Sequence, residues 1–275
     1  MSQTRRRFGQ HFLHDPGVIG RIARAINPGP HDHLLEIGPG RGALTHVLLE
    51  GEYASFDAVE IDRDLAQALR PTMALARAAT LHEADALNFD FAALAASRGG
   101  RLRVIGNLPY NISTPLLFRL IAAAPAIVDL HVMLQREVVA RMAAAPGTGE
   151  YGRLTVMLAP WVTVEQLFDI GPGAFKPPPR VWSAVARLTV RATPAFELAP
   201  QFAQVVTAAF SQRRKTLRNA LRNLLAAPDI EACGVDPSVR AETLAPEDFN
   251  RLALQIGAIG YPSACNVGRS RTEVP

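Results

Sequence analysis

The sequence contains few cysteines and no long apolar run. Cys233 and Cys265 are its only cysteines, and they lack the spacing of metal ligands, so we expect reduced thiols in a cytosolic protein. No stretch of about 18 apolar residues occurs, which predicts that no helix spans a membrane. The first ten residues are basic but no apolar stretch follows them, which is not typical of a secretory signal. We therefore expect a cytoplasmic protein.

Lysine is also scarce, because Lys176 and Lys215 are the only lysines among 29 basic residues. This preference for arginine, in a chain also rich in alanine, indicates a compositional bias, so only the placement of the arginines is informative. The net charge of +4 favours a polyanionic partner without requiring one. The 48% of hydrophobic residues is ordinary for a globular protein, and 275 residues suffice for one large and one small domain.

Short apolar runs alternate with amphipathic helical stretches from residue 16 to about residue 190, which is typical of a parallel α/β sheet. Seven strands are predicted, at His33–Ile37, Phe56–Ile61, Ala79–Glu83, Leu102–Asn107, Leu130–Leu134, Val162–Asp169 and Val181–Val190. A loop rich in Gly and Pro separates the last two, so they can pair as an antiparallel hairpin at one edge. The expected fold class is α/β, with a Rossmann-like, seven-stranded and mostly parallel sheet.

The ends of this region are marked by turn and cap residues. Asp15 and Pro16 predict the start of the first helix, as N-cap and first helical residue. Thr193-Pro194 indicates a linker, and beyond it only helical periodicity remains, with Phe249, Leu252 and Ile256 on one face. We predict a sheet domain over residues 1–192, a small all-helical domain over 193–262, and a tail without pattern over 263–275.

A glycine-rich loop follows the first predicted strand. The segment Gly38-Pro39-Gly40-Arg41-Gly42-Ala43 lies between that strand and a predicted helix. Glycines there let the backbone approach a ligand at the carboxyl end of the strand. Gly38, Gly40 and Ala43 also satisfy the dinucleotide fingerprint of NAD enzymes. The glycines alone therefore leave an NAD site and an S-adenosylmethionine site almost equally favoured.

Two acidic residues follow the next two strands. Glu60 can accept hydrogen bonds from both ribose hydroxyls, a role shared by NAD and S-adenosylmethionine sites. Asp85 can accept a hydrogen bond from the N6 amine of a bound adenine. Alone, Glu60 could instead be a solvated strand end and Asp85 a helix N-cap. Three consecutive strands that each end in a suitable group favour a nucleoside site over that alternative.

The fourth strand ends in Asn107-Leu108-Pro109-Tyr110, which could also be a simple tight turn. An adenine N6 is a poor nucleophile because its lone pair is delocalised into the ring. The Asn107 amide oxygen and the Leu108 main-chain carbonyl could accept both N6 hydrogens and direct the lone pair at a methyl donor, with Tyr110 as a stacking face. The stiff proline run after Phe175 predicts that Phe175 forms a second wall, the alternative being a rigid hairpin loop. No general base and no metal are needed.

Seven motifs in this order resemble the ribosomal RNA adenine N6-dimethyltransferases, and more closely their bacterial small-subunit members. They are Arg7–Leu13, Glu36–Thr45, Asn107–Tyr110, Leu134–Val138, Tyr151–Leu154, Phe175–Ser183 and Phe210–Asn219. The resemblance implies a class I methyltransferase fold and S-adenosylmethionine as methyl donor. It implies donor contacts by His11, Leu13, Gly38, Glu60, Asp85 and Asn107, and a target adenine between Tyr110 and Phe175. The implied substrate is two adjacent adenosines in the 3′-terminal hairpin loop of small-subunit rRNA, on a late pre-ribosomal particle.

Two residues depart from the family pattern. His11 stands where family members mostly have Asn, which puts a side-chain contact to the donor in doubt but not a main-chain contact. Ala84 replaces the Gly that usually precedes the acidic residue. Both changes are expected to be tolerated in catalysis.

A basic segment, Ser211–Arg222, holds five basic residues and no acid: Arg213, Arg214, Lys215, Arg218 and Arg222. As one helix it would place Arg214, Arg218 and Arg222 on a single face. Charge runs are usually solvated faces, but the uniform sign favours a face that binds RNA phosphates.

Several alternatives remain open. The nearest is the large-subunit adenine dimethyltransferase that confers macrolide resistance, which shares the catalytic motifs. A DNA adenine methyltransferase would more often have Pro in place of Leu108. A non-catalytic assembly or transcription factor on this fold would be expected to have lost Asn107, Tyr110 or the donor-site acids. An NAD dehydrogenase would need a hydride-transfer site, and none is evident. We expect a monomer.

Overall fold

The computed structural model describes residues 11–212 and 214–259. Contacts divide the chain into two compact units: residues up to Ala144 with Leu158–Ala195, and Ala145–Met157 with the residues from Phe196 onward. We call them the sheet unit and the helical unit. The division differs from the predicted boundary at residue 192 mainly because Ala145–Met157 groups with the C-terminal helices. The predicted tail over 263–275 lies outside the described residues.

The sheet unit contains a seven-stranded sheet in the order β4-β3-β2-β5-β6-β9-β7. Its strands are β2 (His33–Ile37), β3 (Ser55–Glu60), β4 (Ala79–Glu83), β5 (Leu102–Asn107), β6 (Ile127–Gln135), β7 (Val162–Ile170) and β9 (Ser183–Val190). The first five pair in parallel, whereas β9 pairs antiparallel with both β6 and β7. The predicted Rossmann-like sheet and its antiparallel edge pair are confirmed.

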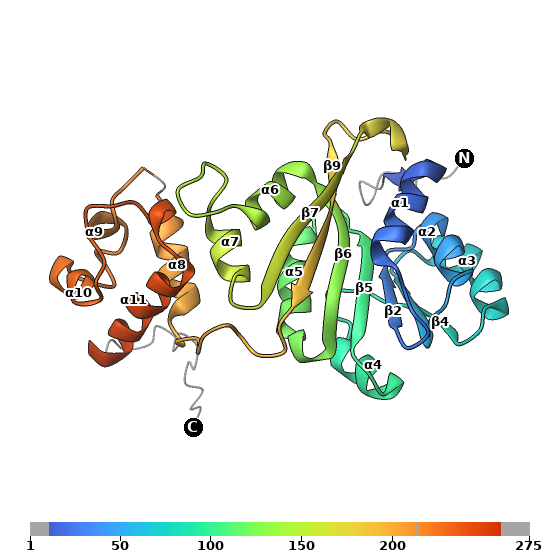
Figure 1. The fold of residues 1–275 in the computed structure, drawn as a ribbon, viewed down its shortest axis with the longest axis horizontal. Coiled ribbons are helices and arrows are strands. Elements are labelled where there is room, and N and C mark those ends of the chain that lie inside the picture. Colours follow the sequence, from blue (N-terminus) through green and yellow to red (C-terminus); the bar gives the residue numbers. More distant parts are fainter. Residues whose placement is uncertain (1–10, 213, 260–275) are drawn as a thin grey trace, which may run out of the picture. The chain divides into compact units, whose positions relative to one another are not determined.

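Helices cover both faces of this sheet, as Figure 1 shows with α1–α3 on one side and α5 on the other. They are α1 (Pro16–Ile26), α2 (Ala43–Leu49), α3 (Arg63–Leu75), α4 (Phe91–Arg98), α5 (Ser113–Ala122) and α6 (Arg136–Ala143), with 3-10 turns η2 (Ala124–Ala126) and η3 (Pro172–Ala174). The Asp15 side chain accepts a hydrogen bond from the Val18 N–H at 2.9 Å, which confirms the predicted N-cap of α1. Ile19, Ile22 and Ile26 of α1 are buried against the sheet.

A second, two-stranded sheet joins distant parts of the sheet unit. Strand β1 (Phe12–Leu13) pairs antiparallel with β8 (Phe175–Lys176), and the His14 N–H donates to the Ala174 carbonyl at 2.9 Å. Strands of two residues carry no periodicity, so the sequence could not predict this pairing. It fixes the segment before α1 beside the loop that precedes β9.

The helical unit contains α8 (Phe202–Phe210), α9 (Leu217–Ala220), α10 (Ala227–Ala232), the turn η4 (Ala241–Thr243) and α11 (Pro246–Ile259), together with all but the last residue of α7 (Arg153–Leu158). Phe249, Leu252 and Ile256 are buried on α11, which confirms the predicted stripe. The apolar stretches of the described helices are too short to cross a bilayer.

The prediction of one helix over Ser211–Arg222 is wrong. Helix α8 ends at Phe210, and α9 covers only Leu217–Ala220. Thr216 between them is extended and bridges to Arg240, while the Leu217 N–H donates to the Val239 carbonyl at 2.8 Å. These tertiary bonds, together with repulsion between like charges one turn apart, outweigh the helical periodicity. Arg214, Arg218 and Arg222 therefore do not share a helix face, and Arg213 lies outside the described residues.

Candidate active site

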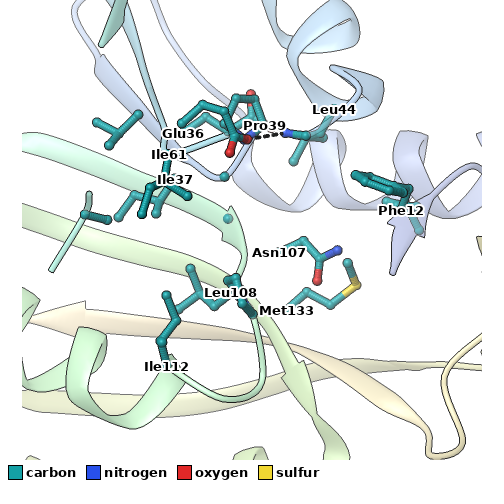
Figure 2. Close-up of a pocket in the computed structure, with 18 of the residues that line it drawn as sticks. Phe12, Glu36, Ile37, Pro39, Leu44, Ile61, Asn107, Leu108, Ile112 and Met133 are labelled. Atoms are coloured by element: carbon teal, nitrogen blue, oxygen red, sulfur yellow. Dashed lines mark hydrogen bonds between the residues drawn. The ribbon is translucent and has the colours of Figure 1, made fainter. Parts of the chain in front are cut away.

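A cavity of about 400 Å³ opens at the carboxyl ends of β2, β3, β4 and β5. The predicted site residues that line it are His11, Leu13, Gly38, Gly40, Glu60, Asp85, Asn107, Leu108 and Tyr110. Figure 2 shows the Asn107 side chain extending from the end of β5 toward this space, with Phe12 and Met133 on the side of its amide. The structure thus brings nearly all of the predicted site residues of the sheet unit together around one cavity.

The loop after β2 is shaped by glycines in the left-handed region. Gly38, Gly40 and Gly42 have φ of 67°, 58° and 77°, which a side chain would strain. A Cβ on Gly40 would also lie 3.2 Å from the Phe12 ring. This loop therefore exposes bare backbone to the cavity, as a site for a nucleoside-containing ligand requires.

Glu60 is the acid at the end of β3, and its side chain is 3% exposed. One carboxylate oxygen accepts the Gly40 N–H at 3.0 Å and the other accepts the Asp62 N–H at 3.0 Å. Burial raises the pKa of the Glu60 carboxyl above its usual value, whereas these two N–H donors lower it. Each oxygen keeps a second lone pair, so the carboxylate can still accept from a ligand hydroxyl.

Asp85 follows β4 and stabilises a turn. Its carboxylate accepts from the Leu87 N–H at 2.9 Å and from the Asn88 side-chain amide at 3.0 Å. The alternative considered for this residue, a helix N-cap, is not formed, because the N-cap of α4 is Asp90. The two hydrogen bonds of the turn do not exclude a ligand contact, because Asp85 also lines the cavity and has acceptor capacity left.

Asn107 is held in one orientation by a distant backbone group. Its Nδ2 donates to the His11 carbonyl at 3.0 Å. Because a carbonyl can only accept, this bond fixes which end of the amide carries the N–H group. Within the described residues the Asn107 Oδ1 accepts no hydrogen bond, so it is available to a donor in the cavity.

Tyr110 and His11 form the rim beside Asn107. The Tyr110 hydroxyl is hydrogen-bonded to the Ser183 Oγ at 2.7 Å, and burial raises its pKa. The His11 ring lies 5.9 Å from the Tyr110 ring, centroid to centroid, and its Nδ1 donates to the Pro177 carbonyl at 2.8 Å. The side chain of His11 is thus tied to the loop before β9, while its main chain is tied to Asn107.

Leu108 and Phe175 complete the predicted acceptor residues. The Leu108 N–H donates to the Met133 carbonyl at 3.2 Å, and Leu108 lines the cavity. Phe175 does not line it. The residue is 2% exposed and packs in a core cluster that includes the buried isoleucines of α1. The second wall predicted from Phe175 is therefore not formed in this structure.

Two buried polar residues of the cavity were missed. Glu36, the last residue but one of β2, accepts a hydrogen bond from the Thr45 hydroxyl at 2.6 Å. Burial raises the pKa of Glu36 to about 7, helped by the charge of Glu60 and opposed by the Thr45 bond. His131 lies on β6, and within the described residues neither of its buried ring nitrogens forms a hydrogen bond, although Nδ1 lies 3.7 Å from a carboxylate oxygen of Asp129. A charged or polar residue inside an apolar strand was the signal that could have found them.

The described basic residues of the segment Ser211–Arg222 are exposed, namely Arg214, Lys215, Arg218 and Arg222. In residues 11–212 and 214–259 no three His, Cys, Asp or Glu side chains gather in a way that could hold a metal ion.

The profile of a family described as "Ribosomal RNA adenine dimethylase" matches residues 1–257. The chain belongs to the ribosomal RNA adenine dimethylase family. It is 54% identical over 259 residues to the Ribosomal RNA small subunit methyltransferase A of Pseudomonas aeruginosa, covering 94% of this chain and 96% of that protein. It is 50% identical over 253 residues to the protein of that name from Methylococcus capsulatus, covering 92% of this chain and 97% of that protein.

Solved structures agree with the fold of this dimethylase. A dimethyladenosine transferase from Plasmodium falciparum has a TM-score of 0.78 at 24% identity, covering 91% of this chain and 98% of that one. The 23S rRNA methyltransferase ErmE has a TM-score of 0.68 at 28% identity, covering 90% of this chain and 99% of that one. Both match nearly the whole length of the chain.

Proposed function

We propose that the chain transfers methyl groups from S-adenosylmethionine to N6 of two adjacent adenosines in the 3′-terminal hairpin loop of small-subunit rRNA, twice on each. The observation that carries this proposal is the fixed amide of Asn107, which lines the cavity together with Tyr110 and whose Oδ1 accepts no hydrogen bond within the described residues. The names of the relatives at 50–54% identity support the small subunit as the source of the RNA.

The donor side fits a nucleoside with a charged tail. Gly38 and Gly40 leave backbone exposed, Glu60 can accept from ribose hydroxyls, and Asp85 can accept from an adenine amine. His11 and Leu13 lie on the same cavity, where the family resemblance implies donor contacts. S-adenosylmethionine, when bound there, supplies a methyl group that its sulfonium sulfur has already activated.

The acceptor side can align the N6 nitrogen of adenine, which is a weak nucleophile. Asn107 Oδ1 and the Leu108 carbonyl would accept the two hydrogens of N6, which localises the nitrogen lone pair and aims it at the methyl group. Because the Asn107 amide is already oriented by the His11 carbonyl, little reorganisation is needed when the base arrives. No side chain has to act as a general base, since the proton can leave to water.

The target base would stack on Tyr110, whose ring is held through Ser183. Phe175 is proposed as the second wall only after its side chain has left the core cluster, because in this structure it is buried. Such a change would place the base between two aromatic rings.

The exposed basic residues of the helical unit are proposed to bind phosphates of the small-subunit RNA within a pre-ribosomal particle. If so, each change of Arg214, Arg218 or Arg222 to Gln should reduce the slope of log affinity against log salt by about 0.7–0.9. Because all three are exposed, stability should change by less than about 0.5 kcal/mol. A salt titration of the triple variant with the same slope as the wild type would show that these arginines only face water.

A large-subunit substrate is less well supported. The similarity to the 23S rRNA methyltransferase ErmE, at 28% identity, is much lower than that to the small-subunit enzymes. A cytoplasmic location and a monomeric state remain predictions.

The test offers methyl-labelled donor together with unmethylated small subunits, large-subunit RNA or DNA. We expect label only in the RNA of the small subunit, and none with Asn107→Ala under the same conditions. Transfer to large-subunit RNA alone would establish the alternative.

A further inference from the structure

An exposed aromatic residue lies at the start of β9. Trp182 is 50% exposed and its neighbour Val181 is 44% exposed. Trp182 is the only aromatic residue among the large hydrophobic residues that the described chain exposes to this degree. Lys176 and Arg180 are exposed in the segment that leads to these two residues, and the Arg136 guanidinium lies 5.9 Å from the centroid of the Trp182 ring. We call these five residues the Trp182 strip.

The backbone of Trp182 is held by a hydrogen bond at the end of β6. The Trp182 carbonyl accepts the Arg136 N–H at 2.9 Å, which fixes the backbone at the end of β6. A Cβ added to Gly171 would lie 3.7 Å from the indole, so a residue larger than glycine at this position would contact the ring. The backbone of Trp182 is thus fixed while half of its surface faces solvent.

The charges of the strip are uniformly positive. No acidic residue occurs between Asp169 and Glu197. Lys176 and Arg180 are exposed, and neither forms an ion pair within the described residues. The Arg136 guanidinium lies 5.9 Å from the indole centroid and 3.6 Å from Asp169, an exposed pair of little energetic value. The side chains of Arg136, Arg180 and Lys176 are therefore available to bind phosphates.

The strip begins at the rim of the cavity. The residue after Trp182 is Ser183, whose hydroxyl holds Tyr110. At the other end, Lys176 of β8 lies opposite Phe12 of β1 in the two-stranded sheet, and Phe12 lines the cavity. A polymer whose base stacks on Tyr110 would therefore meet the strip with its adjoining residues.

We propose that the Trp182 strip binds the unpaired RNA next to the target adenosine, with one base stacked on the indole and phosphates at Arg136, Arg180 and Lys176. This inference rests on the proposed function. An aromatic face surrounded by arginine is the arrangement that binds single-stranded RNA with little sequence preference. Two apolar residues are too few for a stable protein interface, which needs about 800 Å² on each partner.

The chain offers a direct optical test, because Trp161 is its only other tryptophan. In Trp161→Phe, Trp182 is the sole indole, and unmethylated small-subunit RNA should quench its fluorescence through stacking. In Trp182→Phe, Trp161 is the sole indole and should not respond. Equal responses of the two variants, or no quenching in Trp161→Phe, would overturn the proposal.

Measurements of RNA affinity provide a second test of the proposal. Trp182→Ala should weaken RNA binding about tenfold, whereas Trp182→Phe should retain most of the affinity because it keeps an aromatic face. Arg180→Gln should lower the salt slope by about 0.7. Leu75→Ala, which removes a 90% exposed apolar side chain outside the strip, serves as the control and should bind like the wild type. Unchanged affinity in Trp182→Ala would contradict RNA stacking and leave a protein partner as the alternative.

The two proposals can fail separately. If the wild type transferred no methyl group to small subunits, the proposed function would fail even where Trp182 is quenched by RNA. If the wild type were active and Trp182→Ala bound RNA normally, only the strip would fail.

Discussion

The cavity has a donor wall, formed by Gly38, Gly40, Glu60 and Asp85, and an acceptor wall, formed by Asn107, Leu108 and Tyr110. The two walls are held in different ways. On the donor wall, Glu60 accepts from backbone N–H groups of adjacent loops and Asp85 caps its own turn. On the acceptor wall, side chains join segments far apart in the sequence: Asn107 to His11, and Tyr110 to Ser183. A change on the donor wall should therefore act mainly on donor affinity. A change on the acceptor wall should act mainly on the rate of transfer.

The largest effect is expected at the acceptor wall. Asn107→Ala removes the oriented amide, and the rate of methyl transfer should fall at least about 100-fold. Single-turnover measurements at saturating donor and RNA would show it. A rate near that of the wild type would contradict the proposed alignment of N6 and remove the distinction between the walls.

The buried carboxyl of Glu36, which also lines the cavity, should make the free energy of unfolding depend on pH. Its pKa rises from an ordinary value of 4.5 to about 7 on folding, because the carboxyl is buried. The folded state thus holds the proton more tightly, so the stability that this group contributes is complete below pH 4.5 and is lost as pH rises through about 7. At 1.36 kcal/mol per pH unit, the loss is about 3 kcal/mol.

Glu36→Gln provides the matched comparison, since it cannot ionise. Unfolding free energies of the two proteins, measured from pH 4.5 to 7.5, should diverge as pH rises, with the wild type losing stability relative to the variant. Parallel profiles would show that Glu36 does not hold its proton in the folded protein.

Glu60 tests the donor wall itself. Glu60→Ala should weaken donor binding by about 1–3 kcal/mol, through loss of charge-assisted hydrogen bonds, while RNA binding changes little. Calorimetry with S-adenosylmethionine measures this directly. Unaltered donor affinity would remove Glu60 from the site.

The smallest effect is expected at His11, which lines the cavity beside Tyr110 and whose carbonyl holds Asn107. Its Nδ1–H donates to the Pro177 carbonyl, so His11→Phe should cost about 1 kcal/mol, roughly fivefold in transfer rate. His11→Asn keeps an N–H donor at a similar place and should restore most of the rate. His14→Phe, at an exposed neighbour that does not line the cavity, is the control. A loss confined to donor affinity would instead assign the His11 side chain to the donor wall.

The same contrast explains what the sequence could predict. The sheet and the residues at its strand ends follow from periodicity and from the rule that parallel strands end at one edge, which predicts that Gly38, Glu60, Asp85 and Asn107 lie close together, and all four line the cavity. The β1–β8 pairing and the burial of Phe175 depend on contacts over more than 160 residues. The segment Ser211–Arg222 has helical periodicity, but the bridge from Thr216 to Arg240 interrupts the helix. Periodicity does not report such tertiary bonds.

Product mapping tests the central claim most directly. Unmethylated small subunits would be incubated with the protein and donor, and their RNA digested and mapped by mass spectrometry. The proposed function predicts N6,N6-dimethyladenosine at two adjacent positions of the 3′-terminal hairpin loop, and none with Asn107→Ala. Methylation at any other position, or only single methylation of each adenosine after complete reaction, would contradict it.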